Sequence, residues 1–196
     1  MAAPNTKPRV YLAGPDVFLS SPIARGDALK AICQKYDLVG LFPFDNELSG
    51  FEPHSFGLAH AIRGANMDLI KSCDAILANM TPFRGPSMDV GTAYEMGVGA
   101  ALGKVVVGYT LDGGMGYVDK VHTWAGDKNL VRGDDGHLRD VGGMAVEEFN
   151  MEAGTSGLID NLMMSCGIEK LCLSEEEAVE VLADTLHRRQ VKSASS

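Results

Sequence analysis

A strand–helix–strand unit is encoded by residues 75–109, which have the sequence AILANMTPFRGPSMDVGTAYEMGVGAALGKVVVGY. The apolar run at 75–80 predicts a buried strand, and the run at 104–109 predicts a second one. Between them, a loop containing Gly and Pro leads into a helical pattern over about 88–102. Two buried strands connected through a helix are typical of a parallel sheet, so this unit predicts an α/β fold.

The same alternation of strands and helices extends in both directions from this unit. Further strands are predicted at 9–13 and 37–42, and further helices at 22–36, 56–72, 157–166 and 174–189. The expected fold class is α/β, a flavodoxin-like or Rossmann-like doubly wound parallel sheet with three αβα layers. Ligands of such sheets bind beyond the carboxyl ends of the strands, which places the expected site at the loops after residues 13, 42, 80 and 109.

The chain is expected to form one domain over residues 9–190. Residues 1–8 are polar and contain Pro, which predicts a disordered lead-in, and residues 191–196 predict a disordered tail. Residues 110–155 interrupt the alternation, because they are rich in Gly and charge. This insertion is interpreted as a lid that orders on ligand binding, a partner-binding arm or a mobile segment.

Composition restricts the class of protein. Of the 196 residues, 45% are apolar and 22% are charged, which is ordinary for a globular domain. The net charge of -9 disfavours a nucleic-acid polymer as partner, because binding phosphates requires Lys and Arg. No apolar run approaches the roughly 18 residues that span a bilayer, and the N-terminus lacks the apolar segment of a secretory signal, so no membrane partner is expected.

The cysteines provide information about metals and about the compartment. Cys33, Cys73, Cys166 and Cys172 show neither C-x-x-C pairing nor the spacing of zinc ligands. Buried or free thiols in a reducing compartment are the simplest interpretation, which predicts a cytoplasmic protein. No cluster of His, Cys and Asp has metal-ligand spacing, so neither a metal nor a cofactor is expected.

Two acidic residues follow the strand predicted at 75–80. Glu95 lies in an otherwise apolar helical segment, where a buried carboxylate must be paired or used. Asp89 is about 240° away around a regular helix, so the two carboxylates converge only if Asp89 lies in the N-cap. A carboxylate here could attack the anomeric carbon of a sugar and form a covalent glycosyl-enzyme, while a second acid assists the leaving group. The alternatives are a plain helix cap for Asp89 and a solvated helix residue for Glu95.

Five motifs together resemble the nucleoside 2-deoxyribosyltransferase family. They are YLAGPDVF at 11–18, FPFDNE at 42–47, NMDLIKSCD at 66–74, DVGTAYEMG at 89–97 and DNLM at 160–163. Together they cover most of the first half of the chain and a short segment further on. The resemblance implies that 2-deoxyribose is transferred between purine or pyrimidine bases by a retaining double displacement, as in nucleoside salvage.

The resemblance also implies roles for individual residues. Glu95 corresponds to the nucleophilic glutamate, Asp89 to an acid that holds the sugar hydroxyls and orients the nucleophile, and Tyr11 to a tyrosine near the nucleophile. Glu47 corresponds to a Gln or Glu that reads the base, and Asp68 to an acid associated with base binding or protonation. Topology argues against Asp68, because it lies late in its helix and therefore points away from the carboxyl edge.

The turn after the first strand and a distant segment complete the expected site. Gly14 and Asp16 belong to that turn, and Asp16 is a weaker candidate than Glu47 for contacting the base. Asn161 and Met163 correspond to a segment that a neighbouring subunit supplies, so the resemblance implies a homo-oligomer, a dimer or a trimer of dimers. The implied partners are small-molecule deoxynucleosides and free nucleobases. A plain turn for Gly14 and ordinary helix positions for Asn161 and Met163 remain open.

Other functions remain open as well. An N-glycosidase would pass deoxyribose to water, and a deoxynucleoside-monophosphate hydrolase would need donors for a 5'-phosphate. Arg84 and Ser87 could supply such donors, but Asp89 disfavours a phosphate there. A nucleotide phosphoribohydrolase fits G-T-x-x-E at 91–95, but Ser87-Met88 replaces the diglycine that would hold phosphate. A non-catalytic nucleotide-sensing module could use the same fold.

Overall fold

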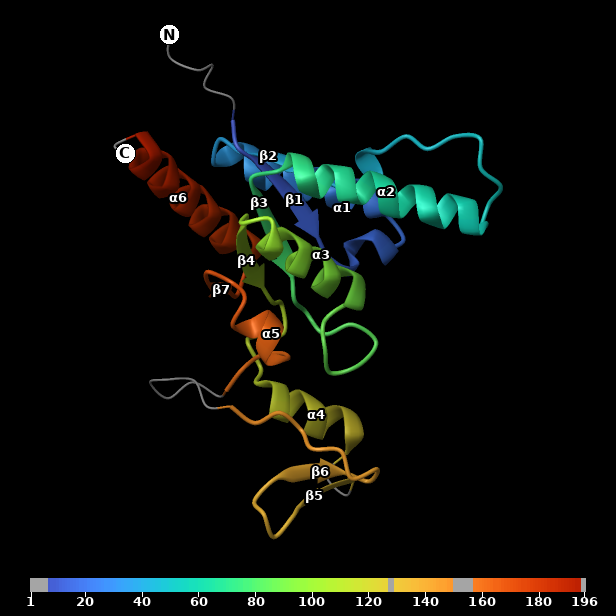
Figure 1. Cartoon of the computed structure of the whole chain (residues 1–196), viewed down its shortest axis with the longest axis vertical. Coiled ribbons are helices and arrows are strands. Elements are labelled where there is room, and N and C mark those ends of the chain that lie inside the picture. The colour runs from blue at the N-terminus through green and yellow to red at the C-terminus, as the bar shows by residue number, and fades with distance from the viewer. Residues whose placement is uncertain (1–6, 127–128, 150–156, 195–196) are drawn as a thin grey trace.

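The computed structural model describes residues 7–126, 129–149 and 157–194. Its main sheet has five parallel strands in the order β2-β1-β3-β4-β7 (Figure 1). The strands are β1 (Arg9–Ala13), β2 (Val39–Leu41), β3 (Ala75–Asn79), β4 (Val105–Tyr109) and β7 (Leu171–Cys172). The prediction of an α/β fold with a doubly wound parallel sheet is confirmed.

Each face of the sheet is covered by its own pair of helices. The helices α1 (Pro22–Lys35) and α6 (Glu175–Ala194) cover one face, and α2 (Phe56–Ser72) and α3 (Val90–Ala101) cover the other. In β1, Val10 and Leu12 pack with α1 and α6, whereas Tyr11 and Ala13 pack with α2 and α3. Because both faces are covered, β3 and β4 are buried throughout. The alternation along β1 also directs Tyr11 toward α3.

Some element boundaries differ from the sequence pattern. The strand predicted at 37–42 is limited to β2, because Asp37 has a φ of 61° and belongs to the turn that ends α1. The tail predicted at 191–196 is also shorter, because α6 continues to Ala194. No Gly or Pro interrupts the chain there. Residues 1–6 of the predicted lead-in lie outside the described residues.

The insertion between β4 and β7 contains a small folded unit. It comprises α4 (Tyr117–Ala125) and an antiparallel pair of strands, β5 (Leu130–Arg132) and β6 (Leu138–Asp140). Val121, Leu130 and Leu138 form its own apolar cluster. Residues 117–126 and 129–149, here called the arm, project away from the main sheet in Figure 1. The helix predicted at 157–166 is limited to the single turn α5 (Leu162–Ser165).

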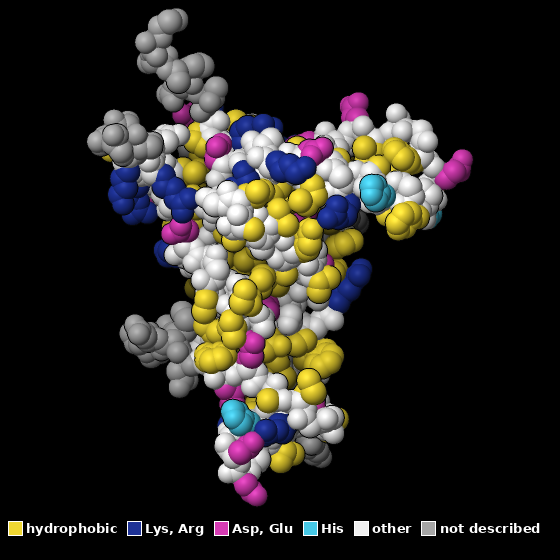
Figure 2. Space-filling view, viewed as in Figure 1, with side chains coloured by type: hydrophobic (Ala, Val, Ile, Leu, Met, Phe, Trp, Pro, Cys, Tyr) yellow, Lys and Arg dark blue, Asp and Glu magenta, His cyan; other side chains and the backbone are white. Residues whose placement is uncertain are grey.

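The outer surface carries exposed apolar groups on α3. Val90, Tyr94 and Leu102 are all exposed there, and apolar side chains gather over the middle of this face in Figure 2. Cys33, Cys73 and Cys172 are buried and Cys166 is exposed, all as free thiols. Within the described ranges, no helix combines the length and the apolar character needed to cross a membrane.

Candidate active site

The site is built around a hydrogen bond between β1 and α3. Tyr11 is fully buried, and its hydroxyl donates to Oε1 of Glu95 at 2.6 Å. These residues are far apart in the sequence, but β1 lies beside β3, and the chain that leaves β3 enters α3. A hydroxyl-to-carboxylate bond of this length is a charge-assisted one, and it fixes the direction of the Glu95 side chain.

The surroundings of Glu95 bring the pKa of its carboxyl group close to neutral pH. The pKa of Glu95 is raised from 4.5 to about 7, mainly by burial; the hydrogen bond from Tyr11 lowers this pKa, and the Asp89 carboxylate contributes to the rise. Burial and the neighbouring Glu95 carboxylate raise the pKa of Tyr11 above its ordinary value, so Tyr11 stays a hydrogen-bond donor. Glu95 can therefore be a carboxylate at neutral pH, yet it receives little solvation that would weaken it as a nucleophile.

Asp89 lies in the N-cap of α3. Its Oδ2 accepts from the backbone N–H of Thr92 at 2.9 Å and from the Thr92 hydroxyl at 3.0 Å. This position outside the regular helix brings Asp89 near Glu95, because two fully helical residues at this spacing would lie on different faces. Both hydrogen bonds use Oδ2, so Oδ1 is available to a ligand hydroxyl.

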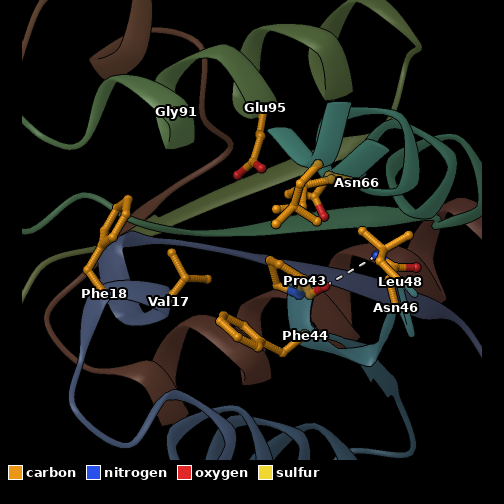
Figure 3. A pocket seen from close by; sticks show the side chains of 11 residues that line it. Val17, Phe18, Pro43, Phe44, Asn46, Leu48, Asn66, Gly91 and Glu95 are labelled. Atoms are coloured by element: carbon orange, nitrogen blue, oxygen red, sulfur yellow. Dashed lines mark hydrogen bonds between the residues drawn. The ribbon is translucent and has the colours of Figure 1, made fainter. Parts of the chain in front are cut away.

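Glu95 faces a cavity of about 500 Å³ between α2, α3 and the turns after β1 and β2. Most of its lining is apolar, from Val17, Phe18, Pro43, Phe44, Leu48, Leu58 and Ile62, and the polar side chains are Asn46, Asn66 and Glu95. In Figure 3, Glu95 points from α3 into this space, with Phe18 and Val17 on one side and Asn66 and Leu48 on the other. A mainly apolar cavity with a few convergent polar groups is typical of a small-molecule site.

A second cavity of about 340 Å³ continues from the first between α2 and α3. The two share Glu95, Asn66 and Ile62 in their linings. The outer wall is formed by Arg63, which donates to the Tyr94 hydroxyl at 3.0 Å and lies over the Tyr94 ring. The two cavities together form one groove between α2 and α3, and a ligand in either cavity can reach Glu95.

Three of the acids and turn residues expected at the site are placed elsewhere. Asp68 has a side chain 76% exposed and paired with Lys71, and it does not line the cavity of Glu95. Glu47 is exposed, although its neighbours Asn46 and Leu48 line the cavity. Asp16 is buried in hydrogen bonds with Arg25 at 2.7 Å and Asn79 at 3.0 Å, on the far side of the turn.

Gly14 has a packing role in that turn. A Cβ on Gly14 would lie 2.4 Å from Oδ2 of Asp16 and 2.8 Å from Cβ of Asn79, so only glycine allows this approach. The turn then carries Val17 and Phe18 to the cavity wall. The glycine therefore shapes the cavity indirectly.

The segment around Asn161 does not reach the cavity within one chain. Asn161 caps α5, accepts from the backbone N–H of Met163 at 3.0 Å and donates to Glu147 of the arm at 2.8 Å. Met163 is 68% exposed on the surface. Exposed placement is what a segment needs if it is to contact another subunit, and that role stays a prediction.

Asn66 was not among the residues proposed from the sequence. Its Oδ1 is buried without a hydrogen-bond partner among the described residues, and its side chain lines both cavities. Asp68 comes two positions later, about 200° around the helix, which explains why it faces solvent. The spacing of Ile62, Asn66 and Ile70 marks one face of α2 and was the available signal. In the parts of the chain that the structure describes, no group of three or more His, Cys, Asp or Glu residues could hold a metal ion.

Comparisons with known proteins agree with this geometry. The family model for nucleoside 2-deoxyribosyltransferase matches residues 10–163. An uncharacterized protein of Schizosaccharomyces pombe is 36% identical over 200 residues, which cover 96% of this chain and 92% of that protein. A 2-desoxiribosyltransferase from Leishmania mexicana is similar in structure, with a TM-score of 0.66 and 32% identity over 90% of this chain and 97% of that one.

A conserved protein from Enterococcus faecalis has a TM-score of 0.57 at 20% identity, over 91% of this chain and 98% of that chain, and shows a shared fold. The family match places this parallel α/β sheet, with a half-buried carboxylate facing a ligand-sized cavity, among enzymes of the glycosyl-transferring class. The chain belongs to the nucleoside 2-deoxyribosyltransferase family. The resemblance noted in the sequence motifs is thereby confirmed.

Proposed function

We propose that this enzyme transfers 2-deoxyribose between nucleobases, with Glu95 as the covalent nucleophile. The observation that carries the proposal is the half-buried Glu95 carboxylate, held by Tyr11 at 2.6 Å and facing a cavity of about 500 Å³. A cavity of this volume suits a ligand of nucleoside size. The similarity to the Leishmania mexicana 2-desoxiribosyltransferase supports the same activity.

The reaction proceeds in two displacements. An oxygen of Glu95 forms a bond to C1' as the N-glycosidic bond breaks, and the bonding electrons leave with the base, which takes up a proton on a ring nitrogen. The ring nitrogen of a second base then attacks C1' and gives up its proton, which balances the proton taken up by the first base, and Glu95 is released as a carboxylate. Two inversions return the β configuration of the starting nucleoside.

The neighbouring residues have distinct tasks in this scheme. Tyr11 orients Glu95, and Asp89 offers Oδ1 to a sugar hydroxyl. Asn66 supplies a carboxamide whose Oδ1 has no partner among the described residues, and we assign it to hydrogen bonding with the base. Ribonucleosides react poorly, because a hydroxyl at C2' disfavours the oxocarbenium-like transition state and crowds Glu95.

Assembly into a homo-oligomer belongs to the same proposal. Asn161 and Met163 complete the site of a neighbouring subunit, and the exposed Tyr94 on α3 lines the cavity that they would cover. Sedimentation of the wild type and of Met163→Asp tests this assignment. A monomeric wild type with full activity would contradict it. The free thiols of the four cysteines accord with a cytoplasmic location, which we propose as well.

The deciding experiment separates transfer from hydrolysis. Purified protein is incubated with deoxyinosine, with and without cytosine, and the products are separated by chromatography. Transfer predicts deoxycytidine with cytosine and little hypoxanthine without it. Equal release of hypoxanthine in both samples would establish an N-glycosidase instead. Intact-mass analysis of acid-quenched enzyme should show one deoxyribosyl group attached, and Glu95→Ala should abolish both this adduct and the activity.

A further inference from the structure

Asp160 is a buried carboxylate that takes no part in the proposed reaction. It is 2% exposed and lies just before α5. Its Oδ2 accepts from the backbone N–H of Met88 at 2.7 Å, and its Oδ1 accepts from the backbone N–H of Asn161 at 2.8 Å. Both oxygens are therefore used as acceptors for main-chain groups, which suits a fixed anchor rather than a proton carrier.

The residue that Asp160 holds immediately precedes Asp89. Met88 is itself buried in the apolar cluster beneath α2 and α3. At this point the loop that leaves β3 becomes α3, so the amide of Met88 fixes where the helix starts. The location of the Asp89 carboxylate relative to Glu95 depends on this start.

Asp160 is held from its other side as well. The Ser165 hydroxyl accepts from the backbone N–H of Asp160 at 3.0 Å and donates to its carbonyl at 2.8 Å. Lys120 of the arm donates to the carbonyl of Ile159 at 2.9 Å and pairs with Asp112 at 2.9 Å. Asp160 and its neighbour Ile159 thus connect Lys120 of the arm to the loop before α3.

We propose that Asp160 is a positioning residue, which holds the Asp89 carboxylate against Glu95 through the amide of Met88. The effect on catalysis rests on the function proposed above, whereas the effect on Glu95 itself does not. Supporting contacts of this kind are what keep reacting groups in productive geometry.

The groups around Glu95 make the proposal specific. Tyr11 reaches it from β1, Asp89 from the N-cap of α3, and Arg63 from α2 lines the same groove. Of these three, Asp89 adjoins the residue that Asp160 holds. Loosening Asp160 should therefore act on Glu95 through Asp89, by moving a negative charge away from it, and this change favours the ionised form of Glu95.

The test measures the titration midpoint of the Glu95 carboxyl group directly. Protein labelled with ¹³C at the glutamate side-chain carboxyl is titrated by NMR, with Glu95→Gln used to assign the signal. Asp160→Ala should lower the titration midpoint of Glu95 by about half a pH unit or more and reduce kcat/KM at least tenfold. Asp140→Ala is the matched control, since Asp140 also accepts two backbone N–H groups, at 2.8 and 3.0 Å, but in the arm. It should leave both quantities unchanged.

A double variant separates positioning from general support. If Asp160 acts through Asp89, Asp160→Ala should not move the midpoint further when added to Asp89→Asn. An unchanged midpoint in folded Asp160→Ala, or an equal added shift in the Asp89→Asn background, overturns the proposal even if stability falls. If Asp160→Ala does not fold, Asp160→Asn keeps the volume and one acceptor and should shift the midpoint in the same direction. A wild type without transfer or hydrolysis would refute the proposed function, while the midpoint would still decide this proposal.

Discussion

Replacing Glu95 by Gln should make the protein more stable while abolishing its activity. Glu95 has a pKa of about 7 in the folded protein and an ordinary value of 4.5, and the largest cause is burial. At about 1.4 kcal/mol per pH unit, this difference corresponds to roughly 3 kcal/mol against folding when Glu95 is ionised. The carboxamide introduced by Glu95→Gln keeps the volume and an oxygen that can accept from Tyr11, but it avoids the buried charge.

The sign follows from proton binding. Between pH 4.5 and about 7, the folded protein holds the Glu95 proton more tightly than the unfolded chain does. The stability that Glu95 contributes is therefore fully present below pH 4.5, is lost as the pH rises toward about 7, and stays lost above it. Glu95→Gln has no such loss, so its advantage over wild type should grow with pH and level off at about 3 kcal/mol.

Urea unfolding of both proteins at a series of pH values from about 4 to about 8.5 measures this difference. Glu180→Gln is the control for the chemical change itself, because Glu180 is an exposed acid on α6 that does not line the cavity of Glu95. A difference between Glu95→Gln and wild type that is flat with pH would refute the reasoning. So would a wild type that becomes the more stable of the two at alkaline pH.

Three further outcomes are expected. Tyr11→Phe removes a hydrogen bond that lowers the pKa of Glu95. The rising limb of kcat/KM plotted against pH should therefore move to higher pH, and the rate should fall roughly 10- to 100-fold. A limb that stays in place would contradict the assigned contact. Asn66→Leu should reduce kcat/KM about tenfold for the preferred base and narrow the differences across a panel of deoxynucleosides; unchanged selectivity would exclude Asn66 from base recognition. Lys120→Met leaves Asp112 without its ion-pair partner and should lower the free energy of unfolding by about 3 kcal/mol, as measured in urea; a loss below about half a kcal/mol would show that the pair is not an important support.

The central sheet could be predicted from the sequence because its strands are buried on both faces. Continuous apolar runs mark β1, β3 and β4, and no polar alternation obscures them. Strand β7 could not be found, because a pair of residues against the end of β4 leaves no periodic pattern. The hairpin of the arm had a signal in Asp135-Gly136, but the surrounding Gly-rich composition concealed it.

The candidate site was predictable to the extent that it depends on local structure. The N-cap position of Asp89 and the inward direction of Glu95 follow from helix geometry. The side chain of Asn66 could not be placed in the same way, because its orientation depends on how α2 packs against α3. Glu47 and Asp16 lie on turns, where the sequence does not determine the direction of a side chain, and Asp16 is taken up by Arg25 and Asn79.

Both outermost strands of the sheet are very short, with three residues in β2 and two in β7. A sheet edge is a row of unpaired N–H and C=O groups onto which a strand of another molecule can add, and a short edge offers few of them. The most apolar segments of this chain, β3 and β4, lie between these ends and are already paired on both sides. The order of the strands thus protects a sheet rich in Val, Ile and Leu from fibre-like association between molecules at high concentration.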